Sequence, residues 1–177
     1  LYRTVQRNRH DTIREDRVEE ASIGMFYELA WQFSENWRTV LGLRGDYYHF
    51  DVDAGDPANA GTESGSVISP KLNLIYAISE ITEAYLSVGQ GFHSNDARGT
   101  TISMDPVSGD PVRPADPLVK STGAEVGLKT VWLESWNSSL ALWHLELDSE
   151  LLFVGDAGTT EASRPSQRWG LELNNYW

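Results

Sequence analysis

The segment ASIGMFYELAWQF, residues 21–33, carries an apolar side chain at every odd position. The even positions are mixed and include Ser22, Glu28 and Gln32. A period of two places the two sets on opposite faces of an extended strand, whereas a helix has a period near 3.6. The segment therefore predicts a β-strand with one wholly apolar face.

Six later segments repeat this alternation, and no stretch shows helical periodicity of useful length. We expect Ala141, Trp143 and Leu145 on the apolar face of their strand, with His144 and Glu146 opposite. The pattern predicts an all-β fold, an antiparallel up-and-down meander of about seven strands. Besides residues 21–33, the predicted strands cover residues 37–50, 67–78, 84–92, 121–132, 140–148 and 168–177.

Most of these strands span roughly 11–14 residues, whereas strands of globular proteins have about 5–6 residues. A tilted strand that crosses a bilayer needs about 9–11 residues. The meander is therefore expected to be part of a large transmembrane β-barrel. On the strand around Leu86, we expect Ala84, Leu86 and Val88 to face lipid and Tyr85 and Ser87 to face the interior.

The connections alternate strictly between short and long. Short turns are predicted at 34–36, 79–81 and 134–136, and long loops near 51–66, 94–119 and 155–165. Barrels of the outer membrane have short periplasmic turns and long outer loops. The short turns are therefore expected in the periplasm and the long loops outside the cell.

Aromatic residues gather near both ends of the predicted strands. Two aromatic girdles at the water interfaces are typical of membrane barrels. The alternative is that these residues fill the core of a soluble β-sandwich. The short-turn group is Trp31, Phe33, Trp37, Trp132 and Trp136, and the long-loop group is Tyr47, Tyr48, Phe50, Phe92 and Trp169.

Composition excludes several classes of function. The net charge of −12 argues against a nucleic-acid partner, which requires a basic surface. The chain has no cysteine, and its four histidines lack the spacing of a metal site. Asp51, Asp53 and Asp56 do not match a calcium-loop spacing. We therefore expect no metal site, no cofactor, no catalytic residues and no enzyme activity.

Five stretches, in this order along the chain, resemble the barrel of TonB-dependent outer-membrane receptors. Each motif is weak alone, and the order of the five carries the resemblance, which covers nearly the whole chain. The stretches are GLRGDYYHFDV (42–52), SPKLNLIYAISEITEAYLSVGQGFHSNDARGTT (69–101), GAEVGLK (123–129), LALWHLELDSELLF (140–153) and WGLELNNYW (169–177).

The resemblance implies a barrel of about 22 strands with a plug domain inside its lumen. It also implies outer-membrane lipid as surroundings and active import of a scarce nutrient, such as an iron–siderophore or similar chelate, driven by the TonB complex through the plug. The sequence shows no plug and about a third of the strands, so residues 1–177 are expected to be a partial barrel from a longer protein.

Two alternatives stay open at this point. One is a passive porin or a structural outer-membrane barrel. The other is a soluble β-sandwich binding module, in which a second sheet would bury Leu41, Leu43, Leu128 and Leu171.

A polar cluster follows the strand around Leu86, where the chain is expected to leave the membrane. We predict substrate contacts at the outer rim and lumen from His93, Asn95, Asp96, Arg98, Arg44 and Tyr48. The alternative for Asp96 and Arg98 is a mutual contact within a turn. Further charges are expected to line the lumen or to form interstrand ion pairs: Arg38, Asp46, Lys71, Glu125, Lys129 and Glu172.

Overall fold

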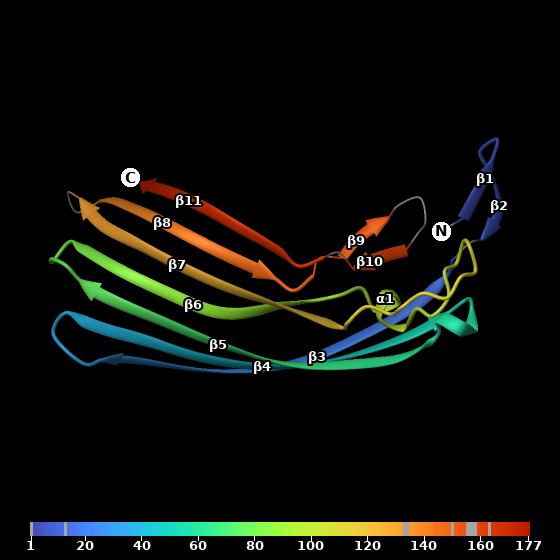
Figure 1. Ribbon diagram of the computed structural model, residues 1–177, viewed down its shortest axis with the longest axis horizontal. Coiled ribbons are helices and arrows are strands. Elements are labelled where there is room, and N and C mark those ends of the chain that lie inside the picture. Colours follow the sequence, from blue (N-terminus) through green and yellow to red (C-terminus); the bar gives the residue numbers. More distant parts are fainter. Residues whose placement is uncertain (1, 13, 133–134, 150, 155–158, 163) are drawn as a thin grey trace.

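The computed structural model describes the chain except for residues 1, 13, 133, 134, 150, 155–158 and 163. Seven long antiparallel strands form one curved sheet in the order β11-β8-β7-β6-β5-β4-β3 (Figure 1). Consecutive long strands are neighbours, so the predicted up-and-down meander is confirmed. The strands are β3 (Asp16–Gln32), β4 (Trp37–Ala54), β5 (Gly61–Ala77), β6 (Thr82–Ser94), β7 (Leu118–Trp132), β8 (Trp136–Leu147) and β11 (Ser166–Tyr176).

Four short strands and two short helices complete the described chain. β1 (Tyr2–Val5) pairs with β2 (Asn8–Thr12), and β9 (Leu151–Val154) pairs with β10 (Thr159–Ala162). A 3₁₀ turn, η1, covers Pro57–Asn59, and a one-turn helix, α1, covers Ala97–Thr101. No helix among the described residues is long and apolar enough to cross a membrane.

The hairpin of β1 and β2 was not predicted from the sequence. Its tight turn places Gln6 and Arg7 at φ values of 50° and 67°, the left-handed region that two-residue hairpin turns use. The stretch from residue 2 to residue 12 is charged and lacks an apolar alternation, so the sequence pattern gave no strand signal there.

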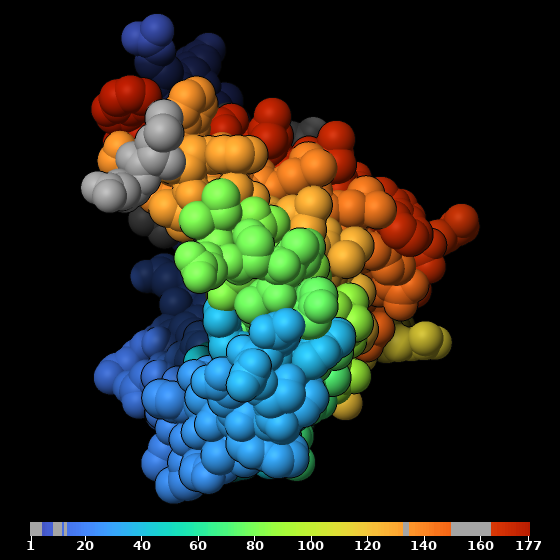
Figure 2. All heavy atoms as spheres, turned by 90° about the vertical axis from the view of Figure 1, so that its left-hand side faces the viewer, coloured from blue at the N-terminus to red at the C-terminus, as the bar shows by residue number. Residues whose placement is uncertain are grey.

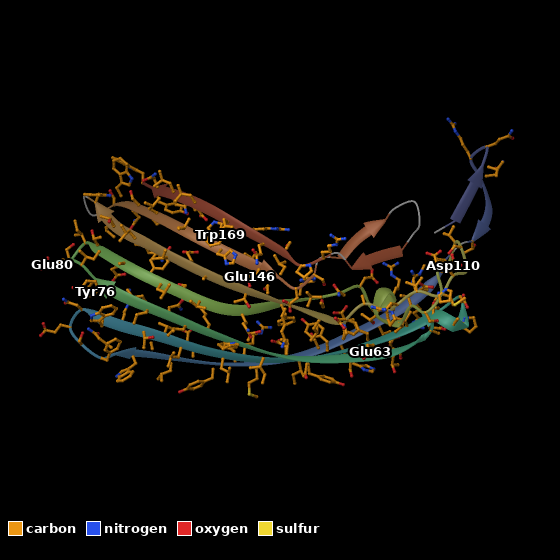
Figure 3. The ribbon with its side chains drawn as sticks, viewed as in Figure 1. Glu63, Tyr76, Glu80, Asp110, Glu146 and Trp169 are labelled. Atoms are coloured by element: carbon orange, nitrogen blue, oxygen red, sulfur yellow. The ribbon has the colours of Figure 1, made fainter. Side chains whose placement is uncertain are left out.

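The short and long connections lie at opposite ends of the sheet. At the short-turn end, the β3–β4 connection, the β5–β6 connection and the adjacent ends of β7 and β8 follow one another in chain order along an arc (Figure 2). Tyr76 and Glu80 mark this end, whereas Glu63 and Asp110 mark the end with the long connections (Figure 3).

The predicted loop over residues 51–66 is too wide. β4 continues to Ala54 and β5 begins at Gly61, with Val52 paired to Gly61. Because water surrounds a strand beyond the membrane, polar residues can occupy both of its faces there. Residues 95–117 connect β6 and β7, close to the predicted 94–119. In the predicted loop 155–165, residues 155–158 and 163 lie outside the described residues, and β10 occupies Thr159–Ala162.

Cross-strand pairing assembles one continuous apolar face. Odd positions of β3, β4 and β11 lie on it together with even positions of β5, β6, β7 and β8. Leu43 is 54% exposed and Leu171 is 73% exposed, so no second sheet covers this face within the described chain. The β-sandwich alternative is therefore wrong.

The predicted face of β8 is also wrong. Leu140 pairs with both Leu128 and Leu173, which places the even positions of β8 on the apolar face. His144 and Glu146 consequently lie on that face, towards its long-loop end, while Trp143 lies on the opposite face. Both residue sets of this strand contain apolar side chains, so only the pairing partners decide its orientation.

The apolar face has the height of a bilayer. On β4 it runs from Trp37 to Tyr47, both exposed. Ten steps of about 3.4 Å along a strand tilted by about 45° give a height of about 24 Å, close to the apolar band of about 25 Å in membrane barrels. The sheet therefore has the dimensions of a membrane-spanning wall.

Aromatic rings mark the short-turn margin of this band. Trp37 lies 4.7 Å from Tyr76 and 6.3 Å from Phe33 between ring centroids, and Trp136 lies 5.8 Å from Trp177. The predicted long-loop girdle is only partly correct. Tyr47 and Trp169 are exposed on the apolar face, but Tyr48, Phe50 and Phe92 pack together: the first two lie on the inner face, and their rings are 6.0 Å apart.

Candidate functional site: the inner face of the sheet

The inner face, opposite the apolar face, holds most of the charged residues of the spanning strands. Even positions of β4 and β11 meet odd positions of β5, β6 and β7 on this concave surface. The residues predicted as lumen charges therefore share one face. These are Arg38, Arg44, Asp46, Lys71, Glu125, Lys129 and Glu172.

Two arginines of β4 are held by carboxylates. Arg38 makes a bidentate pair with Glu83 of β6, at 2.5 and 2.7 Å, across the intervening strand β5. Arg44 donates to both carboxylate oxygens of Asp46, at 2.7 and 2.8 Å, and Asp46 is buried. The predicted interstrand ion pairs therefore occur at Arg38, whereas the partner of Arg44 lies two residues along the same strand.

A trough of about 610 Å³ lies on the inner face between β5 and β11. Gly89 and Gly123 pair across β6 and β7 and form part of its floor. Lys71 lines the β5 side of the trough, and Trp143 and Glu172 line the opposite side. The missing side chains of the glycines deepen the surface, because no Cβ atoms project from the backbone there.

Lys71 differs from the two arginines of β4. It is exposed and makes no ion pair with any residue in the described part of the chain. A Cβ atom at Gly42 would lie 3.4 Å from the Cβ of Lys71, so the lysine stem rests beside bare backbone. Its ammonium group is therefore open to a partner from outside this chain segment.

Tyr85, Glu125 and Lys129 form a small polar network beside the trough. The Tyr85 hydroxyl donates a hydrogen bond to Glu125, and the Lys129 ammonium lies 4.9 Å from the Tyr85 ring centroid. The ring lies over Gly127, where any side chain would collide with it. The tyrosine ring therefore lies against the backbone of β7.

The polar cluster after β6 has a clear structural role at Asp96. Its carboxylate caps α1 by accepting from the Arg98 backbone N–H at 2.9 Å, and it pairs with the Arg98 guanidinium at 2.5 Å. The Arg98 side-chain hydrogen bond is the main reason that the pKa of Asp96 lies below its ordinary value. The contact between Asp96 and Arg98 that the sequence offered as an alternative to substrate binding is present.

The other predicted site residues lie in separate places. Asn95 is buried and donates to the Asp116 carbonyl oxygen at 2.6 Å. Tyr48 packs edge-on against Phe92, with ring centroids 5.7 Å apart, and Arg44 lies further along β4. His93 is partly exposed on the inner face near the end of β6.

Sequence reasoning missed Asn59, at the end of η1. The side chain is 3% exposed, donates to the Met104 carbonyl, and accepts from the backbone N–H groups of Ser103 and Met104, each at 2.9 Å. Thr101 adds a hydroxyl hydrogen bond to the Asn59 carbonyl at 3.0 Å. In a polar stretch of sequence, an asparagine predicts only a turn. No pattern in the neighbouring sequence could therefore have identified its contacts with residues 101–104.

We call the long-loop part of the molecule the outer lobe: residues 48–67 together with residues 92–119. Its core contains Phe50, Val52 and Ala97, all at most 2% exposed, with Tyr48 packed against them. β5 and β6 stop pairing beyond Lys71 and Gly89, so the outer part of β6 is free to lean towards β4. No group of three His, Asp or Glu side chains in the described chain has the arrangement of a metal site.

The chain is similar to known membrane receptors over its whole length. A family model described as "TonB dependent receptor-like, beta-barrel" matches residues 2–177. The alcaligin outer-membrane receptor FauA of Bordetella pertussis matches 90% of the chain at 21% identity and a TM-score of 0.64. The copper transporter OprC matches 90% of it at 19% identity and a TM-score of 0.70.

A third similar structure is the ferric-catecholate import receptor Fiu of E. coli K12. It matches 95% of the chain at 15% identity and a TM-score of 0.70. The chain spans 27% of the length of each of these three proteins. At these identities, the likeness shows a shared fold.

Proposed function

Because this chain belongs to the TonB-dependent receptor-like β-barrel family, we propose that it forms part of the wall of an active outer-membrane importer. The cargo is a scarce nutrient such as an iron–siderophore or similar chelate. The observation that carries the proposal is a single sheet with an apolar face of bilayer height on one side and a charged, trough-bearing face on the other. A wall between lipid and a wet lumen requires this asymmetry.

The family also fixes the surroundings of the chain. As a member of that family, the chain lies in the bacterial outer membrane. We place the short turns on the periplasmic side and the outer lobe outside the cell, because long loops of such barrels face outwards. Energy coupling runs from the TonB complex through a plug domain within the lumen. On the inner face of the wall, Lys71 presents an ammonium group that has no ion-pair partner in the described chain.

Substrate contact is proposed for the residues at the outer rim and lumen: His93, Asn95, Asp96, Arg98, Arg44 and Tyr48. His93 is the strongest of them, because it is partly exposed on the inner face and its side chain makes no hydrogen bond or ion pair with any residue that the structure describes. Asp96 and Arg98 already satisfy each other, so a cargo must compete with their ion pair.

Uptake by the full-length receptor tests the proposal. Cells that lack their own importers and express the receptor would be supplied with radioactive iron as a ferric catecholate, a ferric hydroxamate or ferric citrate, and separately with copper. We expect accumulation of at least one probe that disappears when TonB is deleted. Accumulation that persists without TonB would instead support the passive porin, and no accumulation of any probe would contradict a metal-chelate cargo.

A matched pair of variants tests the site within the same assay. His93→Ala should reduce uptake of the transported probe, whereas Asn137→Ala, at an exposed position near the short-turn end, should leave uptake unchanged. Equal uptake by both variants would remove His93 from the substrate path.

A further inference from the structure

The connection between β6 and β7 lies on the inner side of the sheet. Tyr48, Phe50 and Val52 occupy even positions of β4, as Arg44 does, and therefore face the lumen side. α1 packs against this surface through the buried Ala97, which belongs to the same core as Phe50 and Val52. In Figure 1, α1 accordingly lies on the concave side of the sheet, above β3 and β4.

The end of the same connection, at Pro117, also packs against the inner face. Gly65 pairs with Tyr48 and shares its face. A Cβ atom at Gly65 would lie 3.1 Å from side-chain atoms of both Pro117 and Leu118. Residues 95–117 therefore contact the lumen side of the β4–β5 hairpin both near their start and at their end.

Asn59 fastens the middle of this connection to the hairpin tip. Its side chain satisfies three backbone groups at residues 103 and 104 while being almost completely buried. Ser103 adds a hydroxyl hydrogen bond to the Ala58 carbonyl. A buried amide with these partners is costly to release, because opening the contact leaves donors and acceptors unpaired until water reaches them.

We infer that residues 95–117 form a fixed strap, held by Asn59 as its positioning residue, that narrows the outer entrance of the lumen and limits the size of what can enter. The inference rests on the proposed function, because it needs the inner face to border a lumen. A strap on the apolar face would leave the entrance unchanged, and a strap without the Asn59 contacts would be able to swing away.

Thiol labelling in intact cells with reagents of two sizes measures how wide the outer entrance of the lumen is. The full-length receptor would carry Ser121→Cys, a small residue on the inner face that lines the trough, as its only cysteine. Two maleimides would be added from outside: a compact charged one and one attached to a long polyethylene glycol chain. Neither reagent needs cargo or energy, so a failure of uptake and a failure of this inference remain distinguishable.

We expect Asn59→Ala to raise the labelling rate of the large maleimide, relative to the compact one, by about tenfold. Asn59→Asp keeps the acceptor for Ser103 and Met104 but loses the donor to Met104, so a smaller increase is expected. Asn137→Ala serves as the control at the opposite end of the sheet and should leave the ratio unchanged.

Trypsin added to the same cells reports whether the strap has been released. Cleavage after Arg98 requires α1 to open, because the next residue, Gly99, is buried. An increase in both cleavage and the labelling ratio supports the strap. Increased cleavage with an unchanged ratio would show that the connection does not narrow the entrance, and no change in either Asn59 variant would show that Asn59 does not hold it.

Discussion

The spanning sheet and the outer lobe use the same kind of strand in opposite ways. In the spanning sheet, leucines of β4, β7 and β11 remain 42–73% exposed within this chain, because lipid contacts these side chains in the membrane. In the outer lobe, Phe50 and Val52 of the same strand β4 are at most 1% exposed, because a folded connection covers them. One strand thus passes from a surface solvated by lipid to a core of the kind found in water-soluble proteins.

The two regions therefore depend on different sources of stability. The lobe gains from the removal of apolar area from water and from paired buried polar groups. The spanning sheet gains from its backbone ladder, whose groups must all be paired inside a bilayer, and from the exclusion of charge from its apolar face. Substitutions that affect one region strongly should have little effect at matched positions of the other.

The largest difference between the two regions is expected when one phenylalanine in each is truncated and the hydrogen exchange of the outer lobe is measured. Phe50→Ala removes a side chain that is completely buried, and such truncations cost about 3–5 kcal/mol. Phe26→Ala removes a side chain that is 77% exposed on the inner face of β3, so its effect on the lobe should be negligible. Hydrogen exchange with mass spectrometry on peptides from 48–67 and 95–117 of the full-length receptor measures the difference.

Equal protection of these peptides in the two variants would contradict the soluble-type core. Increased exchange across the whole barrel in Phe50→Ala would also contradict the separation between the regions, because the lobe would then be required for the spanning sheet to form.

A difference in stability between the two faces of the spanning sheet is expected when arginine replaces either of two neighbouring residues of β5. Leu72 lies on the apolar face near the middle of the band, and Asn73 lies on the inner face. Arginine on the lipid side near the bilayer midplane costs about 2–4 kcal/mol, so Leu72→Arg should lower the stability of the receptor in lipid vesicles by that amount. Asn73→Arg should change it little, since the inner face already carries charges.

Urea unfolding in vesicles provides the measurement. If Asn73→Arg were as destabilising as Leu72→Arg, the two faces of the sheet would not differ in their surroundings. If neither variant lost stability, the apolar face would not border lipid.

The same contrast explains how far the sequence could predict the structure. The spanning strands carry their own signal: the odd positions from Ala21 to Phe33 are apolar because each must face lipid, whatever the neighbouring strand contains. The β8 segment was misassigned because Leu140 and Leu142 compete with Trp143 and Leu145. Only the pairing with β7 and β11 resolves which set faces outwards.

The outer lobe could not be predicted because its stability comes from contacts between distant segments. Asn59 contacts residues that follow it by 44 and 45 positions. Phe50 belongs to a core only because Ala97 folds over it. Alternation indicates that a strand exists, but it contains no information about which loop will cover the strand, and so the aromatic residues Tyr48 and Phe50 were assigned to a girdle.

The smallest expected effect concerns the charge of Asp96 in the outer lobe. The hydrogen bond from the Arg98 side chain lowers the pKa of Asp96, so the folded lobe favours the ionised carboxylate. This contribution is present above the ordinary aspartate pKa of about 3.9 and is lost as pH falls through the lower pKa of the folded state. Because the pair is partly exposed, with side-chain exposures of 35% and 44%, it contributes less than about 1 kcal/mol.

Asp96→Asn isolates the charge, because asparagine caps a helix about as well as aspartate does. At neutral pH, the peptide covering α1 should exchange slightly faster in the variant than in the parent protein. The difference should shrink as the pH falls below about 4 and vanish only below the lowered pKa of Asp96 in the folded state. Asp105 titrates in the same range, since backbone N–H groups of Ser108 and Val107 lower its pKa, but both proteins retain it. A difference that persisted in acid would assign the effect to the altered cap, so the comparison of the two proteins across pH separates charge from geometry.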